Sequence, residues 1–488
     1  MNALKKLFEP MDLTKGKIWK VIILFSLPIF FSYFFQQIYT IADAAICGKY
    51  LDANQVAGIN NTGNIIFIVL QFAFGCTAGF SVVTANKIGE HDLDGVKKSL
   101  AVQIRLSVII STILTILACL LASPLLNFIG LSKSTNPIQN EIYEAAYYYI
   151  IIIFLGTSAQ IFYNLICSFL RSIGDSLVPL IFLFISTILN IGLDLLFIAV
   201  FNWGVMGAAI ATIIAQFISA IGCFIYTFKK YPIYKLSKKD FKFDFSFDLH
   251  HLKLGLPLAF QFSVLAIGLI VVQAVIVKFD TSIDGEVISA CAQNGFGAAT
   301  KLNNFLMCPF NALGTAMLSY CGQNYGANET TRIKKGVNEA LIIAFVEYII
   351  FGGTGLLLTI NGAYLHIFYS TDKINEMTMY FGNHYLYCDM SLYFILGALF
   401  VFRNSLQGIG KPLYPFLAGI GELIGRTLIC LTLPNIINNG PININANLNA
   451  VYGLTFADPL AWSIAVIIML YGIIKYVYLP KKQKVIQN

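Results

Sequence analysis

The stretch Leu27–Gly48 places one carboxylate, Asp43, inside a segment that is otherwise apolar enough to cross a bilayer. On a helix, Gln36, Tyr39 and Asp43 share one face. A charge at mid-membrane costs about 2.5–3.5 kcal/mol on insertion scales, so an acid there usually takes a proton, pairs or holds a cation, and it indicates a functional site. The alternative is an acid at the outer helix end, in headgroups or water. Pro28 removes a backbone hydrogen bond and is expected to bend this helix.

A second polar pair, Asn190 and Asp194, lies one helical turn apart in the apolar segment Ile188–Phe197. An amide oxygen and a carboxylate suit a hard monovalent cation. Thr212, in the next apolar segment, could add a hydroxyl, and Asn164 could reach the same cavity. The alternatives are a structural polar clasp between helices for the pair and ordinary helix packing for the threonine.

The composition places these acids in a membrane protein. The chain has 488 residues, of which 57% are hydrophobic and 12% charged, and its mean hydropathy is +0.73. These values exclude an ordinary soluble globule. The ten cysteines form no CxxC pair, and the five histidines show no metal-ligand spacing, so we expect the cysteines in apolar cores and the histidines in solvent.

Apolar windows of about 20 residues predict twelve transmembrane helices. They lie near 19–47, 55–81, 100–129, 141–169, 177–200, 204–228, 253–278, 286–318, 337–361, 380–405, 413–435 and 458–479. Residues 229–252 are too polar to span a membrane. The predicted fold is therefore an all-α polytopic membrane protein with an amino-terminal six-helix lobe (1–228), a linker (229–252), a carboxyl-terminal six-helix lobe (253–479) and a tail (480–488).

Most of the 32 Lys and Arg residues lie in alternate loops. By the positive-inside rule, both termini and the linker are cytoplasmic, so the tail is too. The net charge of +7 follows from this topology, and we expect no nucleic-acid partner.

The two lobes resemble each other, which predicts a parallel repeat. Leu27-Pro28 is echoed by Leu256-Pro257, and the turn that contains Gly174 is echoed by the turn that contains Gly410. The repeat places Val272 opposite Asp43, Arg426 opposite Asn190, Cys430 opposite Asp194 and Asp458 opposite Thr212. The second lobe therefore lacks the polar site of the first.

The second lobe has polar residues of its own. Glu422 and Arg426 are spaced for a salt bridge within one helix. A buried structural pair is one interpretation, and a substrate or proton role is the other. Lys301 could form a salt bridge with an acid that the sequence does not identify. We count Lys301 and Arg426 as the intramembrane cations, and we assign Arg403 to the basic loop 403–411.

Several of these features occur in a familiar order. They are Leu27-Pro28, the shared face of Gln36, Tyr39 and Asp43, Gly48, the turn Ile173-Gly174-Asp175-Ser176, and Asn190 with Asp194. This order resembles the multidrug and toxic compound extrusion (MATE) transporters over nearly the whole chain. The spacing of Asn190, Asp194 and Thr212 is similar to the amino-lobe cation site of archaeal and DinF-like members. The resemblance implies two lobes around a V-shaped cleft and export of organic cations and drugs in exchange for Na⁺ or H⁺.

On this basis we expect a multi-pass antiporter of the plasma or inner membrane that acts by alternating access. Cation coupling is assigned to Asp43, Asp194, Asn190 and Thr212, where Na⁺ could bind, and cavity roles to Gln36, Tyr39 and Asn164. Apart from Na⁺ or H⁺ as coupling ion, no cofactor is expected. The expected partners are small organic cations or drugs and membrane lipids, and the protein is expected to be a monomer, not an enzyme. The alternatives are a lipid-linked oligosaccharide flippase and, from another class, a channel or receptor.

Overall fold

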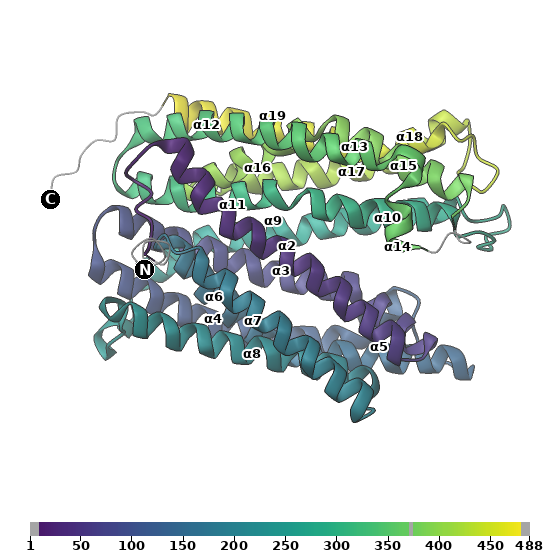
Figure 1. The fold of residues 1–488 in the computed structure, drawn as a ribbon, viewed down its shortest axis with the longest axis horizontal. Helices are drawn as coiled ribbons and strands as arrows, with labels where there is room; N and C mark the ends of the chain where they lie inside the picture. Colours follow the sequence, from purple (N-terminus) through teal and green to yellow (C-terminus); the bar gives the residue numbers. More distant parts are fainter. Residues whose placement is uncertain (1–8, 370–373, 480–488) are drawn as a thin grey trace. The chain divides into compact units, whose positions relative to one another are not determined.

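The structure, a computed structural model, describes residues 9–369 and 374–479, so the predicted tail 480–488 lies outside the described residues. The chain is built from helices (Figure 1). The first seven labelled helices are α2 (Ile18–Tyr50), α3 (Ala53–Gly89), α4 (Leu93–Phe128), α5 (Pro137–Leu155), α6 (Thr157–Ser172), α7 (Leu177–Asp194) and α8 (Gly204–Lys230). The others are α9 (Phe245–Lys278), α10 (Cys291–Leu306), α11 (Cys308–Gly326), α12 (Thr330–Glu347), α13 (Gly353–Leu358), α14 (Leu365–Phe368), α15 (Glu376–Ser391), α16 (Tyr393–Gly408), α17 (Leu413–Asn438), α18 (Ala450–Thr455) and α19 (Ala457–Ile473).

Short helical segments of other types join or extend these helices. The π-helical segments are η1 (Leu195–Val200), η4 (Tyr348–Gly352) and η7 (Ile474–Tyr478), and the 3₁₀ turns are η2 (Pro232–Tyr234), η3 (Lys238–Phe241) and η5 (Ile360–Gly362). Within the described ranges, β pairing is limited to one antiparallel bridge between Thr281 and Val287. The predicted all-α fold class is confirmed.

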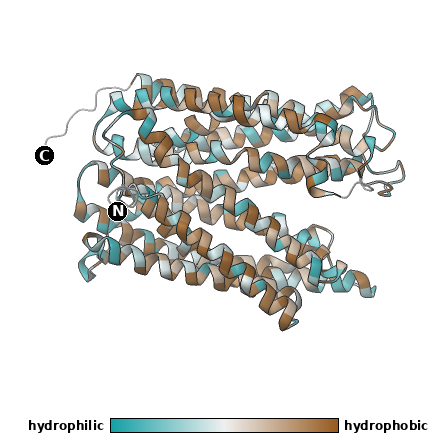
Figure 2. Cartoon of the chain, viewed as in Figure 1, coloured by the Kyte–Doolittle hydropathy of each residue, from teal (hydrophilic) through white to brown (hydrophobic). Residues whose placement is uncertain are grey.

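Within the described part of the chain, nine helical segments are long and apolar enough to cross a membrane, or eleven if each of two bent pairs counts as one span. The bent pairs are α5 with α6, at 45°, and α15 with α16, at 55°. Figure 2 shows brown, apolar residues along the helices and more hydrophilic residues toward their ends and connections. The predicted span 286–318 falls on α10 and α11, which are separated at Met307 and are not among the eleven, so the twelfth span stays a prediction.

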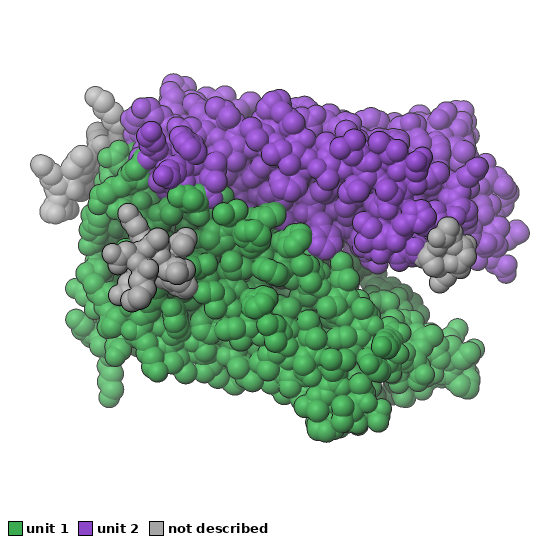
Figure 3. All heavy atoms as spheres, in the orientation of Figure 1, with its two compact units in different colours: residues 1–16, 24–263, 322–329 green, residues 17–23, 264–321, 330–488 purple. Residues whose placement is uncertain are grey.

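The chain divides into two compact units, coloured separately in Figure 3. Unit 1 comprises Leu24–Ser263, the chain up to Gly16, and Gly322–Glu329. Unit 2 comprises Lys17–Ile23, Val264–Cys321 and the chain from Thr330 onward. The helices α2, α9 and α11 therefore each contribute residues to both units. The lobe boundaries at residues 228 and 253 remain predictions.

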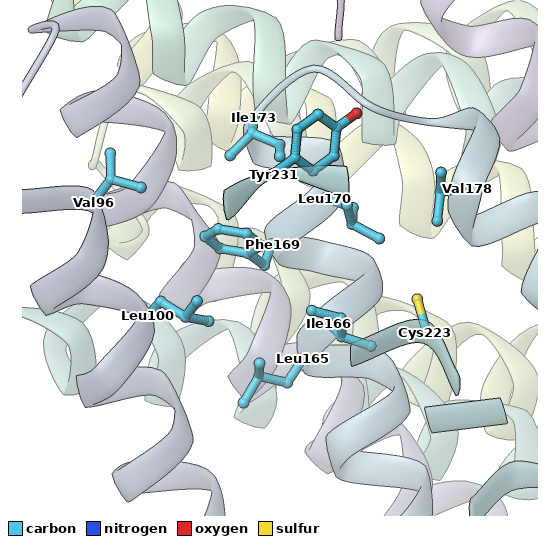
Figure 4. Close-up of a cluster of buried hydrophobic side chains, with 10 residues drawn as sticks. All are labelled: Val96, Leu100, Leu165, Ile166, Phe169, Leu170, Ile173, Val178, Cys223 and Tyr231. Atoms are coloured by element: carbon cyan, nitrogen blue, oxygen red, sulfur yellow. The ribbon is translucent and has the colours of Figure 1, made fainter. Parts of the chain in front are cut away.

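A buried apolar cluster holds α4, α6, α7 and α8 of unit 1 together (Figure 4). Phe169, Leu165 and Leu170 of α6 lie at its centre with no exposed surface, against Leu100 of α4 and Cys223 of α8. In the membrane these contacts act mainly through close packing, because lipid chains are as apolar as the side chains themselves. The cluster fixes α7 and α8, which carry three of the predicted coupling residues.

Glycines allow α3 and the first half of α9 to pack closely within unit 1. A Cβ added at Gly79 would lie 2.5 Å from the Cα of Gly255, and one added at Gly75 would lie 2.5 Å from the Cα of Ala259. Real Cβ contacts do not approach so closely, so neither glycine can be replaced without moving the helices apart. This contact anchors the first half of α9 on unit 1.

The turn between α6 and α7 explains the Ile-Gly-Asp-Ser motif. Gly174 has φ +91°, which favours glycine, and an added Cβ would lie 2.1 Å from the Met11 carbonyl oxygen. Asp175 accepts hydrogen bonds from the N–H groups of Leu177 and Val178 at the start of α7. It also accepts one from the Tyr231 hydroxyl, at 2.6 Å. The motif is thus structural in this chain, because it ties the start of α7 to the end of α8.

The linker after α8 is bound to unit 1. Asp248 at the start of α9 accepts hydrogen bonds from Arg105 Nη2 at 2.5 Å and Nε at 3.1 Å, and Asp244 accepts one from Lys98 Nζ at 2.6 Å. A bidentate Arg–carboxylate pair fixes orientation as well as distance. The basic linker therefore lies against α4 through its acidic residues.

Asp92 caps the start of α4 and provides a test of local stability. Its Oδ1 accepts a hydrogen bond from the Gly95 N–H at 2.8 Å, and this bond, with the nearby Lys87 ammonium, holds the pKa of Asp92 below its usual range despite an opposing effect of burial. The stabilisation is therefore present above the ordinary carboxyl range and is lost as the pH falls through the folded pKa.

We predict that Asp92→Ala lowers the free energy of unfolding by about 1 kcal/mol at neutral pH. The deficit relative to wild type should shrink as the solution is acidified below about pH 4. Thermal denaturation in detergent across pH measures it. Asp94→Ala, which changes an exposed acid in the first turn of the same helix, is the matched control, and an equal, pH-independent loss in both variants would contradict the capping role.

Candidate cation site

The first candidate site lies where α2, α7 and α8 meet in unit 1. Asp194 is the last residue of α7, and the chain continues directly into the π-helical segment η1. Such wider turns are rare and often occur at functional sites. Asp43 is not at a helix end, since α2 continues to Tyr50. Sequence periodicity placed each acid on a polar face, and the fold brings the two faces together.

The two carboxyl groups are near enough to interact side chain to side chain. Beside them, Tyr39 Oη lies 3.3 Å from Thr212 Oγ1, and Asn190 Nδ2 donates to the same oxygen at 3.4 Å. Asp194 has no exposed surface and Asn190 is 2% exposed. The structure thus brings together five of the predicted site residues, from three helices.

The acceptor oxygens of this site are not satisfied by the protein. Within the described ranges, no N–H or O–H group donates a hydrogen bond to Oδ1 of Asp43, Oδ1 of Asn190 or either oxygen of Asp194. Two neighbouring carboxylates cannot both stay charged in a buried place without compensation. The arrangement therefore suits a shared proton, or a hard cation held by carboxylate, amide and hydroxyl oxygens. No group of three or more His, Cys, Asp and Glu residues with metal-binding geometry occurs in the described part of the chain.

Two residues near the acids were not predicted from the sequence as part of the site. Tyr149 of α5 and Cys47 of α2 lie within electrostatic range of both carboxyl groups. Tyr149 packs on a cluster that includes Cys47, Ile198 and Ala208. Cys47 could have been found, because it follows Asp43 by one helical turn. Tyr149 is one of three consecutive tyrosines, and no periodicity distinguishes it from its neighbours.

The other residues predicted to line the cavity make no hydrogen bond to the acid pair among the described residues. Gln36 is exposed on α2, and Asn164 is partly buried on α6. Pro28 lies inside an unbroken α2, where its carbonyl oxygen accepts a hydrogen bond from Ser32 Oγ at 2.9 Å.

Unit 2 contains a buried network of charged side chains. Glu422 accepts hydrogen bonds from Arg426 Nη2 and Arg403 Nη2, each at 2.9 Å, and Arg426 Nε donates to Asp458 Oδ1 at 2.5 Å. All four side chains are at most 9% exposed. The predicted Glu422–Arg426 pair is present. The assignment of Arg403 to a loop was wrong, because α16 continues to Gly408 and buries this guanidinium.

A further buried acid lies beside this network. Asp389 of α15 has no exposed surface, and its Oδ2 accepts a hydrogen bond from Asn303 Nδ2 of α10 at 3.1 Å. Asn303 also donates to the Tyr385 hydroxyl at 2.9 Å. Sequence reasoning missed Asp389, although an acid within a predicted span was the same signal that identified Asp43.

Two other sequence expectations concern basic side chains. Lys301 is exposed, and its ammonium lies 5.6 Å from the centre of the Phe368 ring, so no acid partner is identified for it. The expectation that all five histidines are solvated was wrong for His251, which has no exposed surface. Its Nδ1 donates to the Phe247 carbonyl oxygen at 2.8 Å, so Nε2 accepts from Ser99 Oγ at 2.8 Å.

The fold and the site define a class of protein. It is a helical multi-pass membrane protein with an unsatisfied acid pair between packed helices. A sequence model of the MatE family matches residues 28–196 and 266–430. The chain belongs to this family, the MATE transporters, and is therefore a membrane transporter and not an enzyme. The predicted resemblance is confirmed.

The chain is similar to proteins of the same family over most of its length. It is 28% identical to the probable multidrug resistance protein YpnP of Bacillus subtilis over 434 residues, which cover 85% of this chain and 91% of that protein. It is 22% identical to the probable multidrug resistance protein YoeA of the same organism, over 84% and 86% of the two chains. Among solved structures, a MOP superfamily transporter from Pyrococcus furiosus matches with a TM-score of 0.81 at 20% identity, over 95% and 98%. This last similarity shows the fold.

The two sets of acids should differ in their effect on stability. Glu422→Gln leaves two buried guanidinium groups with a weaker partner, and breaking a buried pair typically costs about 3–5 kcal/mol. Asp194→Asn removes a carboxyl group that the protein does not satisfy, so it should destabilise little or not at all. Thermal denaturation of the two purified variants in detergent compares them. A larger loss of stability in Asp194→Asn than in Glu422→Gln would contradict this assignment.

Proposed function

We propose that this protein is a secondary multidrug antiporter, which exports organic cations or amphipathic drugs in exchange for H⁺ or Na⁺. The observation that supports it most directly is the acid pair of partly buried Asp43 and fully buried Asp194, in which Oδ1 of Asp43 and both carboxyl oxygens of Asp194 lack donors from the described residues. Such a pair needs a proton or a cation, and it can release either one only when the pair is neutralised in another way or is hydrated. The names of the similar proteins from Bacillus subtilis, as probable multidrug resistance proteins, support the substrate class.

The coupling follows from competition for the acid pair. Inward movement of one cation down a potential of 100 mV releases about 2.3 kcal/mol, which can drive export of a substrate. Asp43 and Tyr39 lie on α2, while Asp194, Asn190 and Thr212 lie on α7 and α8. Ion binding would therefore favour one position of α2 relative to α7, and ion release would favour another. We propose that this difference drives alternating access, with Pro28 as the compliant point of α2.

We further propose that the transporter resides in the plasma or inner membrane with both termini cytoplasmic, and that it acts as a monomer. The distribution of Lys and Arg supports this orientation. The second candidate is a lipid-linked oligosaccharide flippase. The pyrophosphate of a lipid-linked oligosaccharide needs cationic side chains inside the membrane, so the buried basic residues decide between the two candidates. Arg403 increases the number of buried cations, but it donates to Glu422, and this pairing favours the exporter.

Dye efflux from sealed vesicles, with Na⁺ and H⁺ gradients imposed separately, tests the proposed function. Efflux driven by either gradient supports antiport. Efflux indifferent to both gradients, in vesicles that contain folded protein, would contradict it.

Asp43→Asn and Asp194→Asn should each abolish ion-driven efflux while leaving expression intact, because each removes a titratable charge at nearly constant size. The double variant should be scarcely worse than either single variant, since residues of one site are not additive. Initial efflux rates against Na⁺ and H⁺ concentration, normalised to folded protein, measure the effect. Wild-type ion dependence in Asp194→Asn would place coupling elsewhere.

Pro28→Ala should slow turnover without changing ion affinity. The substitution restores a backbone hydrogen bond in α2 and makes the helix stiffer. The maximal efflux rate should fall while the ion concentration at half-maximal rate stays constant. An unchanged maximal rate would mean that bending of α2 at this residue is not part of the cycle.

A further inference from the structure

The internal repeat gives each residue of the unit 1 site a counterpart in the second half of the chain, and the structure supports this alignment. Pro28 and Pro257 both lie inside long helices, α2 and α9. Gly174 and Gly410 both have positive φ, +91° and +72°, directly after the bent helix pairs. The counterparts of α2, α7 and α8 are therefore α9, α17 and the final helix, which includes α19.

The counterpart of the Asn190–Thr212 hydrogen bond is an ion pair. In unit 1, Asn190 Nδ2 donates to Thr212 Oγ1 at 3.4 Å. At the corresponding positions in unit 2, Arg426 Nε donates to Asp458 Oδ1 at 2.5 Å. The same two helices are joined at the same place, but a neutral amide and hydroxyl are replaced by a full positive and a full negative charge.

A glycine makes room for the larger side chain. The alignment on Pro28 and Pro257 places Gly268 opposite Tyr39. A Cβ added at Gly268 would lie 2.8 Å from Nη1 of Arg426 and 3.3 Å from its Cδ. Unit 1 thus places a phenol beside the cation site, whereas unit 2 omits the side chain there and Arg426 fills the space.

The acids of unit 1 also have replaced counterparts. Cys430 stands opposite Asp194 and lies within electrostatic range of both Arg426 and Asp458. Val272, opposite Asp43, is 3% exposed. Unit 1 has an acid pair that needs a cation. At the corresponding place unit 2 has one acid, Asp458, whose cation is the guanidinium of Arg426.

We propose that Arg426 is a tethered cation, whose guanidinium permanently occupies in unit 2 the position where unit 1 takes an exchangeable proton or metal ion. A guanidinium is charged at all physiological pH values and presents five N–H donors. Asp458 is thereby neutralised without a soluble ion. The comparison with unit 1 rests on the proposed function, but the neutralisation of Asp458 by Arg426 does not.

The surrounding charges agree with this assignment. Glu422 lies between Arg426 and Arg403, so two guanidinium groups and the two carboxylates of Glu422 and Asp458 balance. Asp389 interacts electrostatically with both Arg426 and Asp458 and is a further acid beside the network. On this assignment Asp458 does not hold an exchangeable ion, because Arg426 already neutralises it.

The test removes the tethered charge in a chain whose unit 1 site is disabled. Asp43→Asn is the parent, and Asp43→Asn/Arg426→Ala is the variant, each purified in detergent. Melting temperatures are compared in NaCl and in N-methyl-D-glucamine chloride at equal ionic strength, and radioactive sodium binding is counted per chain. We expect the variant to melt higher in NaCl than in the organic salt and to bind one more sodium ion than its parent, because a ligand that binds the folded state stabilises it. Methylguanidinium should stabilise the variant in the same way and leave the parent unaffected.

Two controls locate the new ion. Adding Asp458→Asn to the variant should abolish the gain of sodium binding, because the unpaired acid is then gone. Arg403→Ala in the same parent should gain no comparable binding, since Glu422 keeps Arg426 as partner. Equal gains after removal of either arginine, or no gain after removal of Arg426, would overturn the proposal.

A second comparison applies even if Arg426→Ala does not fold. Asp458→Asn in the Asp43→Asn parent leaves the Arg426–Glu422 pair intact. The proposal requires sodium binding to be the same with and without Asp458→Asn, and a loss of bound sodium would show that Asp458 holds an exchangeable ion. Both measurements use detergent-purified protein without any gradient, so their outcome is independent of whether efflux proves to be ion-coupled.

Discussion

The interaction on which this structure depends is the neutralisation of carboxylates that are buried inside a membrane protein. An acid at that depth costs several kcal/mol unless a proton, a cation or a set of donors compensates it. Asp194 has no exposed surface and receives no hydrogen bond from the described residues. Asp458 is also buried but receives a hydrogen bond from Arg426 at 2.5 Å. In the function proposed above, a mobile ion neutralises the first acid, whereas the chain itself supplies the cation for the second.

Rigid packing away from the acids makes these arrangements possible. The contact of Gly75 and Gly79 with α9 anchors that helix, and the bonds of Asp175 join α7 to the end of α8. The apolar cluster around Phe169 packs α7 and α8 against α4 and α6. Because α7 and α8 are held at these points, Asp194 and Thr212 keep their positions, and α2 is the element of the site with a proline in its interior.

Much of this organisation could be predicted from the sequence, because its strongest signals are local or repeated. The helical period placed Gln36, Tyr39 and Asp43 on one face and Asn190 with Asp194 on another. The repeat and the order of motifs predicted the family. That Tyr39 and Asn190 both contact Thr212 depends on how three helices pack, and the sequence offered only the resemblance as a guide.

The residues that were missed share a physical reason. Arg403 was counted with the basic loop that follows because it lies at the end of its apolar window, whereas Glu422 on another helix compensates its charge and allows its burial. Asn303 and Asp389 are far apart in sequence, and only the packing of α10 on α15 reveals their hydrogen bond. His251 was expected in solvent because it lies in the predicted linker, but Ser99 and the Phe247 carbonyl group satisfy both ring nitrogens. In each case a partner from a distant segment or an adjacent turn makes a polar side chain tolerable in the interior.

The repeat thus separates two properties that are often treated as one, the shape of a lobe and its response to ions. A proline in the first helix, a bent helix pair and a left-handed glycine recur in both halves, so the two halves share these features of shape. A response to an ion gradient also requires a site whose charge changes when the ion leaves. The acid pair of Asp43 and Asp194 meets this requirement, whereas a guanidinium joined to its carboxylate partner does not, since its charge is the same at either ion concentration. If Arg426 acts as a tethered cation, the second half keeps the architecture of the first, and a single arginine, with a glycine that admits it, makes its corresponding site independent of soluble ions.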